Sequence, residues 1–192
     1  SFRYEQFLAA LENGNKKRIA QSAKSIEILR HHLNIVETYS KIRTNPEFKL
    51  RVTHHDTKIS NVLFDSQGRG ICVIDLDTVM PGYFISDVGD MMRTYLSPVS
   101  EEEKDFSKIE IRNDFYKAIV RGYYSEMKGE LTETEKKYFF YAGKFMIYMQ
   151  AIRFLADYIN DDIYYGARYS DHNLVRTNNQ IVLLQRLIEK ES

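Results

Sequence analysis

The sequence predicts an α+β fold that is mostly α-helical, with one small β-hairpin in its first half. Two observations lead to this prediction. Over most of the chain, apolar residues recur at intervals of three and four, which is the spacing of one helix face. Between residues 50 and 77 the pattern changes to short apolar runs separated by turn-forming residues, which is typical of β-strands.

Two helical regions are expected before this change of pattern. Residues 4–13 place apolar side chains on one face, and Gly14 provides a stop signal. Residues 15–43 carry a single apolar stripe, so we expect one longer helical region there. It ends near Pro46, because the residue before a proline disfavours helical backbone.

The hairpin is expected over residues 62–76. Two apolar runs flank residues 65–70, where Asp, Ser, Gln, Gly and Arg provide turn chemistry. The single cysteine, Cys72, lies in the second run, where we expect a small buried apolar side chain. Pro81 and Gly82 predict a further turn.

The second half of the chain is expected to be helical. A helix is predicted over residues 86–96, and another start is predicted at Ser100, where three glutamates follow and favour the positive end of a helix dipole. Further helices are expected over residues 108–128, 132–158 and 171–189.

Composition excludes several classes of protein. The 192 residues carry 27 basic and 27 acidic side chains, and a net charge of zero argues against a nucleic-acid partner, which requires a basic surface. No apolar run approaches the roughly 20 residues that cross a membrane, so no membrane partner is expected. With one cysteine, an internal disulfide cannot form, and a cytoplasmic location is the expectation.

Four polar side chains flank the expected hairpin from both sides. Asp56 and Asn61 precede it, Asp75 lies at its end, and Asp77 follows it. If the hairpin closes at its turn, its open ends meet, and Asn61 comes near Asp75. A carboxylate and a carboxamide on rigid backbone suit Mg²⁺, and a second carboxylate can act as a base or orient a hydroxyl nucleophile.

The spacing matches phosphoryl transfer as protein kinases perform it. The pattern His54-x-Asp56-x-x-x-x-Asn61 places an Asp five residues before an Asn, and Asp75 stands where a kinase has its metal-binding Asp. The chain resembles the aminoglycoside phosphotransferase and choline kinase superfamily, and is most similar to its N-acetylhexosamine 1-kinase-like branch. The resemblance covers nearly the whole chain, is specific over about residues 53–93 and is weaker elsewhere, including residues 151–157 and 172–174.

The resemblance implies a role for each of the four polar residues. Asp56 would be the catalytic base or the carboxylate that orients the hydroxyl. Asn61 and Asp75 would bind Mg²⁺ that bridges the phosphates of ATP, the phosphoryl donor. Asp77 would support the metal site or touch the substrate.

Three further residues receive roles from the resemblance. Asp87 would hydrogen-bond the catalytic loop and hold it in place. His54 is expected to be structural, packed under the loop and bonded to backbone. Arg153 would contact the sugar, the alternative being a surface ion pair with Asp157, four residues away on the same helix. One departure concerns His55, which stands where the superfamily often has Gly and puts the shape of the loop in doubt.

The implied function is ATP- and Mg²⁺-dependent transfer of a phosphoryl group to a hydroxyl of a small molecule, with a sugar such as an N-acetylhexosamine favoured. Choline-like amino alcohols and aminoglycosides remain alternative acceptors. A non-catalytic module of the pseudokinase or sugar-binding kind also remains open, and so does a metal-dependent phosphoesterase.

A kinase of this type also needs a nucleotide-gripping lobe. The nine glycines form no Gly-x-Gly-x-x-Gly, and no β-rich region precedes residue 53. Residues 1–192 are therefore expected to be a protein-kinase-like C-terminal lobe, with the substrate and catalytic functions, whose hairpin carries the catalytic and metal loops. The N-terminal nucleotide lobe is expected in cis outside these residues, and the 192 residues alone are expected to be inactive or nearly so.

Overall fold

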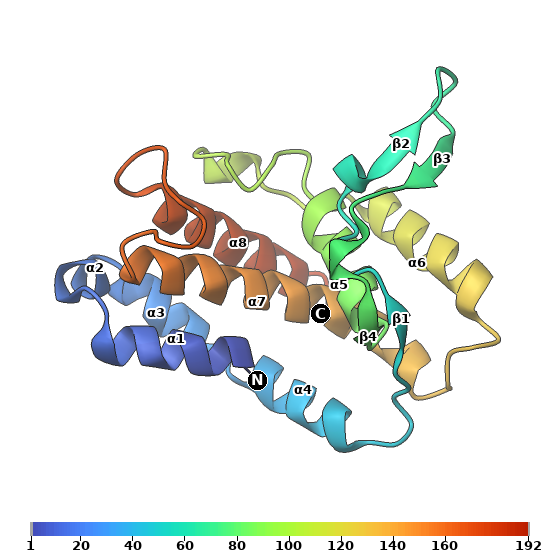
Figure 1. The fold of residues 1–192 in the computed structure, drawn as a ribbon, viewed down its shortest axis with the longest axis horizontal. Helices are drawn as coiled ribbons and strands as arrows, with labels where there is room; N and C mark the ends of the chain where they lie inside the picture. The colour runs from blue at the N-terminus through green and yellow to red at the C-terminus, as the bar shows by residue number, and fades with distance from the viewer. Residues whose placement is uncertain (1, 192) are drawn as a thin grey trace.

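The computed structural model describes residues 2–191, and these are mostly helical (Figure 1). The α-helices are α1 Phe2–Asn13, α2 Lys16–Gln21, α3 Ala23–His31, α4 Asn34–Thr44, α5 Ile85–Tyr95, α6 Asn113–Met127, α7 Phe139–Ile159 and α8 His172–Ile188. The strands are β1 Arg51–Thr53, β2 Val62–Phe64, β3 Gly70–Val73 and β4 Met80–Gly82. Short 3₁₀ helices are η1 Ile59–Asn61, η2 Leu76–Thr78, η3 Phe106–Lys108 and η4 Glu135–Tyr138.

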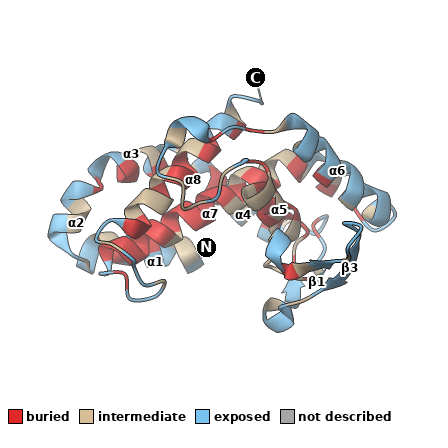
Figure 2. Ribbon diagram, turned by 90° about the horizontal axis from the view of Figure 1, so that it is seen from above, coloured by how far each residue is buried: buried red, intermediate tan, exposed pale blue. Residues whose placement is uncertain are grey.

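Helix α7 forms the centre of the molecule. It packs against α8, α5 and α1, and most of its residues are buried, as the red ribbon in Figure 2 shows. Such a helix is apolar on nearly all sides because other elements cover it on nearly all sides. The fully buried Tyr148, Phe154 and Tyr158 are among its largest side chains. This core supports α5, whose first turn lies against the candidate site.

The strands form two separate antiparallel pairs. The pair β2–β3 is the hairpin predicted over residues 62–76, and it projects from the helical body (Figure 1). The pair β1–β4 joins segments that are far apart in sequence, with Arg51 opposite Gly82. The prediction of a turn at Pro81 and Gly82 is therefore wrong, because these residues form a strand that pairs with β1. Local sequence cannot show this pairing, since β1 lies about 30 residues earlier in the chain.

The single helical region predicted over residues 15–43 is interrupted twice. Helix α2 ends at Gln21, and α3 begins at Ala23. Ser22, between them, donates its hydroxyl to the main-chain oxygen of Arg18 at 2.8 Å. A second break at residues 32–33 separates α3 from α4. A serine that bonds the preceding turn bends the chain without disturbing the apolar spacing on which the prediction depended.

The helix start predicted at Ser100 is wrong. The amide of Asn179 on α8 donates to the main-chain oxygens of Ser100 at 3.0 Å and Glu103 at 3.2 Å. Residues 100–103 therefore form a turn whose carbonyl oxygens are bonded from outside, instead of the first turn of a helix. Cys72 is also exposed, contrary to the prediction, because every residue of β3 is exposed on the projecting hairpin.

Among the described residues, no helix combines the length and apolar character needed to cross a membrane. The other predicted helices are present as α1, α5, α6, α7 and α8. Two of them start later than predicted: α6 begins at Asn113 instead of residue 108, and α7 begins at Phe139 instead of residue 132, after a turn and η4.

Candidate active site

Two loops face each other where the strand pairs meet. Residues 54–61 connect β1 to β2, and residues 74–79 connect β3 to β4. Because β1 pairs with β4 and β2 pairs with β3, both ends of one loop are tied to both ends of the other. The backbone amide of Ile74 adds a hydrogen bond of 2.9 Å to the main-chain oxygen of Asn61. The topology thus brings the two halves of the sequence motif together.

Asn61 fixes the side chain of Asp56. Its amide nitrogen donates to the main-chain oxygen of Asp56 and to the carboxylate Oδ2, each at 2.9 Å. Asn61 is only 5% exposed, so these bonds are largely shielded from water. Because the nitrogen is used in this way, the oxygen of the same amide remains as a hard ligand for a cation.

Lys58 lies between two carboxylates. Its ammonium nitrogen is 2.7 Å from Oδ2 of Asp56 and 3.8 Å from Oδ2 of Asp75. The hydrogen bond to Asp56 raises the pKa of Lys58, so the ammonium stays charged. The structure therefore brings Asp56 and Asp75 to one cation, and part of the acidic charge of this site is neutralised by the chain itself.

Oδ1 of Asp56 is the open side of this carboxylate. Lys58 and Asn61 both bond to Oδ2, and Oδ1 has no hydrogen-bond partner among the residues that the structure describes. A carboxylate held through one oxygen presents its other oxygen in a fixed direction. This arrangement is suited to accept a hydrogen bond from a hydroxyl group.

Asp87 anchors the loop from below. Its carboxylate accepts hydrogen bonds from the backbone N–H of His54 at 3.0 Å and of His55 at 2.7 Å. Its own main-chain oxygen accepts from the hydroxyl of Thr57 at 2.8 Å. The residue lies in the first turn of α5, where a negative charge is favourable. Helix α5 is held by the core, so Asp87 couples the loop to the rigid part of the molecule.

The imidazole of His54 is bonded to backbone on both sides. Nε2 lies 3.0 Å from the main-chain oxygen of Ile74, and Nδ1 accepts from the backbone N–H of Asp56 at 3.3 Å. An accepting Nδ1 and a donating Nε2 describe the neutral ring. His54 thereby links the two facing loops beneath Asp56.

His55 adopts the left-handed conformation, with φ of +66°. Glycine takes this conformation without strain, which is a physical reason for the Gly that the superfamily often has at this position. Here the strain is offset by contacts: Nδ1 of His55 is 2.7 Å from Oγ of Ser86, and Nε2 is 2.7 Å from Oγ1 of Thr53. The loop thus accommodates His55 where the superfamily often has Gly.

The model of the phosphotransferase enzyme family matches residues 3–127, well over half of the chain. The chain belongs to this family. The sequence-based expectation of a phosphotransferase of kinase type, from the aminoglycoside phosphotransferase and choline kinase superfamily, is therefore confirmed at the level of the family. The matched residues include both loops and α5, whereas α7 and α8 lie outside them.

Kinases of this phosphotransferase family generally use ATP and Mg²⁺. Among the described residues, no cluster of three or more His, Cys, Asp or Glu side chains could enclose a metal ion. Mg²⁺ needs fewer protein ligands when phosphate oxygens and water complete its octahedron. The oxygen of Asn61 and the exposed carboxylate of Asp75 are a donor set of this smaller kind. Asp77 is exposed on η2, without a hydrogen-bond partner among these residues.

Sequence reasoning missed a second supporting group on α5. The hydroxyl of Tyr95 donates to the main-chain oxygen of Thr57, and burial raises the pKa of Tyr95 to about 12. Asp90 is buried beside Arg93, with N···O of 2.9 Å, and burial raises its pKa. Both residues lie on α5, the helix that carries Asp87. The partner of Tyr95 is distant in sequence and that of Asp90 is not an acidic residue of the motif, so no pattern among the motif residues indicated these contacts.

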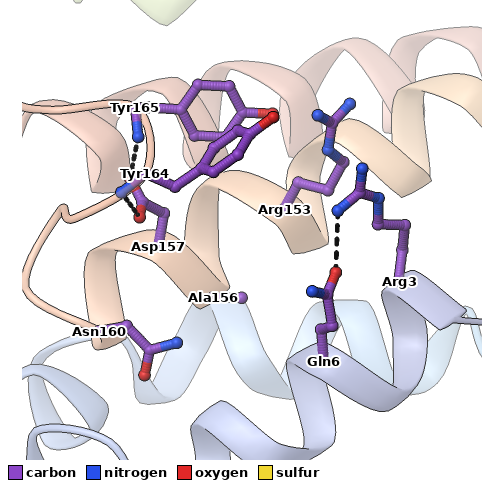
Figure 3. Close-up of a pocket in the computed structure, with 8 residues that line it drawn as sticks. All are labelled: Arg3, Gln6, Arg153, Ala156, Asp157, Asn160, Tyr164 and Tyr165. Atoms are coloured by element: carbon purple, nitrogen blue, oxygen red, sulfur yellow. Dashed lines mark hydrogen bonds between the residues drawn. The ribbon is translucent and has the colours of Figure 1, made fainter.

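Arg153 lies on α7 at the wall of two adjacent cavities. One, of about 120 Å³, is also lined by Arg3 and is drawn in Figure 3. The other, of about 790 Å³, extends to His55. The alternative ion pair with Asp157 is absent, because that carboxylate accepts the backbone N–H of Tyr164 at 2.8 Å and of Tyr165 at 2.9 Å.

Proposed function

We propose that these residues form the catalytic and acceptor-binding part of an ATP- and Mg²⁺-dependent small-molecule kinase. The acceptor is a hydroxyl compound, and a sugar such as an N-acetylhexosamine is favoured. The observation that carries the proposal is Asp56, held through Oδ2 by Lys58 and Asn61 with Oδ1 left open. A positioned base with one free oxygen is what transfer to a hydroxyl requires.

Each polar residue has a part in this proposal. Oδ1 of Asp56 accepts the hydrogen bond of the acceptor hydroxyl and takes its proton as transfer proceeds. Asn61 and Asp75 would hold Mg²⁺, which neutralises the phosphate oxygens and aligns them. Lys58 adds a positive charge between the two carboxylates. This charge reduces the repulsion between the carboxylates and the negative phosphoryl group during transfer. Asp77 is exposed beside this site and would support the metal or the substrate.

We also propose that a nucleotide-binding lobe in cis covers the projecting hairpin. The outer apolar side chains of the hairpin are unusually exposed: Leu63 is 45%, Phe64 48% and Ile71 63% exposed. Apolar side chains grouped around a polar site indicate a partner surface or an apolar ligand such as a nucleotide base. Residues 1–192 would then form the C-terminal lobe.

Metal-dependent nucleotide binding tests the proposal. We would titrate the complete protein with Mn²⁺ and ADP and follow bound Mn²⁺ by electron paramagnetic resonance. Asp75→Asn and Asn61→Leu should each weaken the bound metal–nucleotide complex by roughly tenfold or more, since a ligand to a hard cation is lost. Asp114→Asn, an exposed carboxylate on α6, is the matched control and should bind as the parent does.

Product analysis separates the remaining alternatives. The proposal predicts ATP-dependent phosphorylation of at least one hydroxyl compound from a panel of sugars, amino alcohols and aminoglycosides. Release of inorganic phosphate from phosphoesters without ATP would instead identify a phosphoesterase. Sugar binding with no transfer to any member of the panel, together with unchanged Mn²⁺ binding in both variants, would identify a non-catalytic module.

A further inference from the structure

The larger cavity next to the catalytic loop is basic. It has a volume of about 790 Å³, within the usual range for small-molecule sites, and it extends from His55 and Ser86 to α7. Three arginines line it: Arg3, Arg43 and Arg153. None of the described residues that line it is Asp or Glu.

Two of these arginines are oriented by neutral groups. Nη1 of Arg3 donates to Oε1 of Gln6 at 2.9 Å, and Nη1 of Arg153 donates to Oε1 of Gln150 at 3.0 Å. In Figure 3 both guanidinium groups reach the same region of the cavity wall. An amide oxygen fixes the direction of a guanidinium but leaves its positive charge uncompensated.

Four partly buried arginines elsewhere in the chain are paired with carboxylates. Arg18 contacts Asp162, Arg51 contacts Glu135, Arg93 contacts Asp90 and Glu101, and Arg176 contacts Glu101. No such ion pair is formed by Arg3, Arg43 or Arg153 within the described part of the chain. Arg112, which also has no ion pair among these residues, instead donates to the main-chain oxygens of Tyr95 and Leu96 and so is satisfied by the fold. The cavity arginines differ from these structural arginines because, among the described residues, they line a larger cavity without acidic residues and form no ion pair.

One carboxylate, Asp157, lies at the smaller cavity beside Arg153. It is 6% exposed, and both its oxygens are occupied. Oδ1 accepts from the backbone N–H of Tyr164, and Oδ2 accepts from Tyr165 and from the amide of Asn173. These bonds hold the loop after α7 and engage both oxygens, so Asp157 forms no ion pair with Arg153, although its negative charge remains at the smaller cavity.

We propose that the acceptor is a polyhydroxyl compound that carries an anionic group, either a carboxylate or a phosphate, which Arg153, Arg3 and Arg43 bind. The proposal rests on the proposed kinase function and changes its acceptor from a neutral sugar such as an N-acetylhexosamine to a sugar-like compound that also carries an anion. A guanidinium binds both anions with charge-assisted hydrogen bonds, so the shared chemistry is an oxyanion on a sugar-like body. The aromatic rings of Tyr39 and Tyr83 line the same cavity and suit the faces of such a body.

Matched hexoses test this inference by calorimetric titration of the complete protein without nucleotide or metal. Glucuronic acid and glucose 6-phosphate carry the anion, glucose is neutral, and glucosamine is cationic. At low ionic strength at least one anionic sugar should bind roughly tenfold or more tightly than glucose, because a charge-assisted hydrogen bond is gained. The tighter of the two identifies the anion, and added salt should reduce the preference.

Variants locate the binding site. Arg153→Gln should remove most of the preference for the anionic sugar and leave glucose binding nearly unchanged, whereas Arg153→Lys should keep part of it. Arg121→Gln, an exposed arginine on α6, is the control for charge and should keep the full preference. Circular dichroism establishes that each variant is folded, and Arg43→Gln provides a second loss-of-charge variant on a different helix.

Three results would overturn the inference. These are equal or tighter binding of glucose or glucosamine, no measurable binding of either anionic sugar at millimolar concentration, and a preference that survives in both Arg153→Gln and Arg43→Gln. Because binding is measured without nucleotide, it is independent of phosphoryl transfer. Failure of the proposed kinase function would appear instead in the Mn²⁺ titration and in product analysis.

Discussion

Asp87 and His55 are joined by a hydrogen bond of 2.7 Å from the backbone N–H of His55 to the carboxylate of Asp87, at a residue whose φ is +66°. A second bond from the N–H of His54 completes the anchor. The left-handed residue directly before Asp56 is thus held from helix α5. The direction of the Asp56 side chain depends on this connection between the loop and the core.

Asp87→Asn should loosen the loop. An asparagine presents one acceptor oxygen and one NH₂ group, so one of the two backbone N–H groups loses its partner. We expect the free energy of unfolding to fall by about 1–3 kcal/mol. Urea denaturation measures this change, and Asp114→Asn on α6 is the control. An Asp87→Asn protein as stable as the control would show that the anchor contributes nothing.

Two substitutions of His55 separate backbone strain from side-chain bonding. Both His55→Gly and His55→Ala remove the contacts to Ser86 and Thr53, but only alanine keeps a Cβ in the left-handed conformation. The glycine variant should therefore be more stable than the alanine variant by about 1 kcal/mol. Parallel thermal melts give the order, and the reverse order would mean that the loop has left the conformation described here.

Gly82→Ala should disturb the same loop from the opposite strand. A Cβ at Gly82 would lie 2.4 Å from Cε1 of His55 and 2.4 Å from Oγ1 of Thr53, which no side chain tolerates. We expect a loss of about 1–3 kcal/mol in the free energy of unfolding. Gly70→Ala is the matched control in β3, because its nearest atom would be 3.4 Å away. Equal effects of the two substitutions would contradict the close approach at Gly82.

The burial of Tyr95 predicts that the free energy of unfolding depends on pH in the alkaline range. Burial raises its pKa to about 12 from a reference value of 10.0, so the unfolded chain releases this proton at lower pH than the folded chain does. The contribution is present below pH 10 and is lost as the pH rises from 10 to about 12. Tyr95→Phe should show a flatter fall of stability over this range, in urea titrations at several pH values. Identical slopes would rule out the contribution of Tyr95.

Much of the local structure could be predicted because its causes are local. The apolar spacing of residues 171–189 and the turn chemistry of residues 65–70 are read from neighbouring side chains, and both elements are present. Cys72 was predicted wrongly because apolar runs in a projecting hairpin look like buried ones. The prediction of a helix start at Ser100 was wrong because the main-chain oxygen of Ser100 accepts a hydrogen bond from Asn179, which is distant in sequence.

The sequence predicted that Asp56, Asn61 and Asp75 belong to one site, but it could not show how these residues are connected. The spacing of Asp56 and Asn61 indicated a shared site, and the structure adds that Asn61 donates to Asp56. Nothing in the spacing showed that Lys58 contacts both Asp56 and Asp75, since its two partners lie in different loops. The charge of the cavity at Arg153 likewise arises from helices α1, α4 and α7, which only the fold brings together.

Single-turnover phosphoryl transfer by Asp56→Asn tests the central proposal most directly. The complete protein, its Asp56→Asn variant and the Asp114→Asn control would be mixed with labelled ATP, Mg²⁺ and a turned-over acceptor. We predict that Asp56→Asn loses at least roughly a hundredfold in transfer rate, because the base is removed, and still binds nucleotide and acceptor. Transfer by Asp56→Asn at the rate of the control would contradict the proposal.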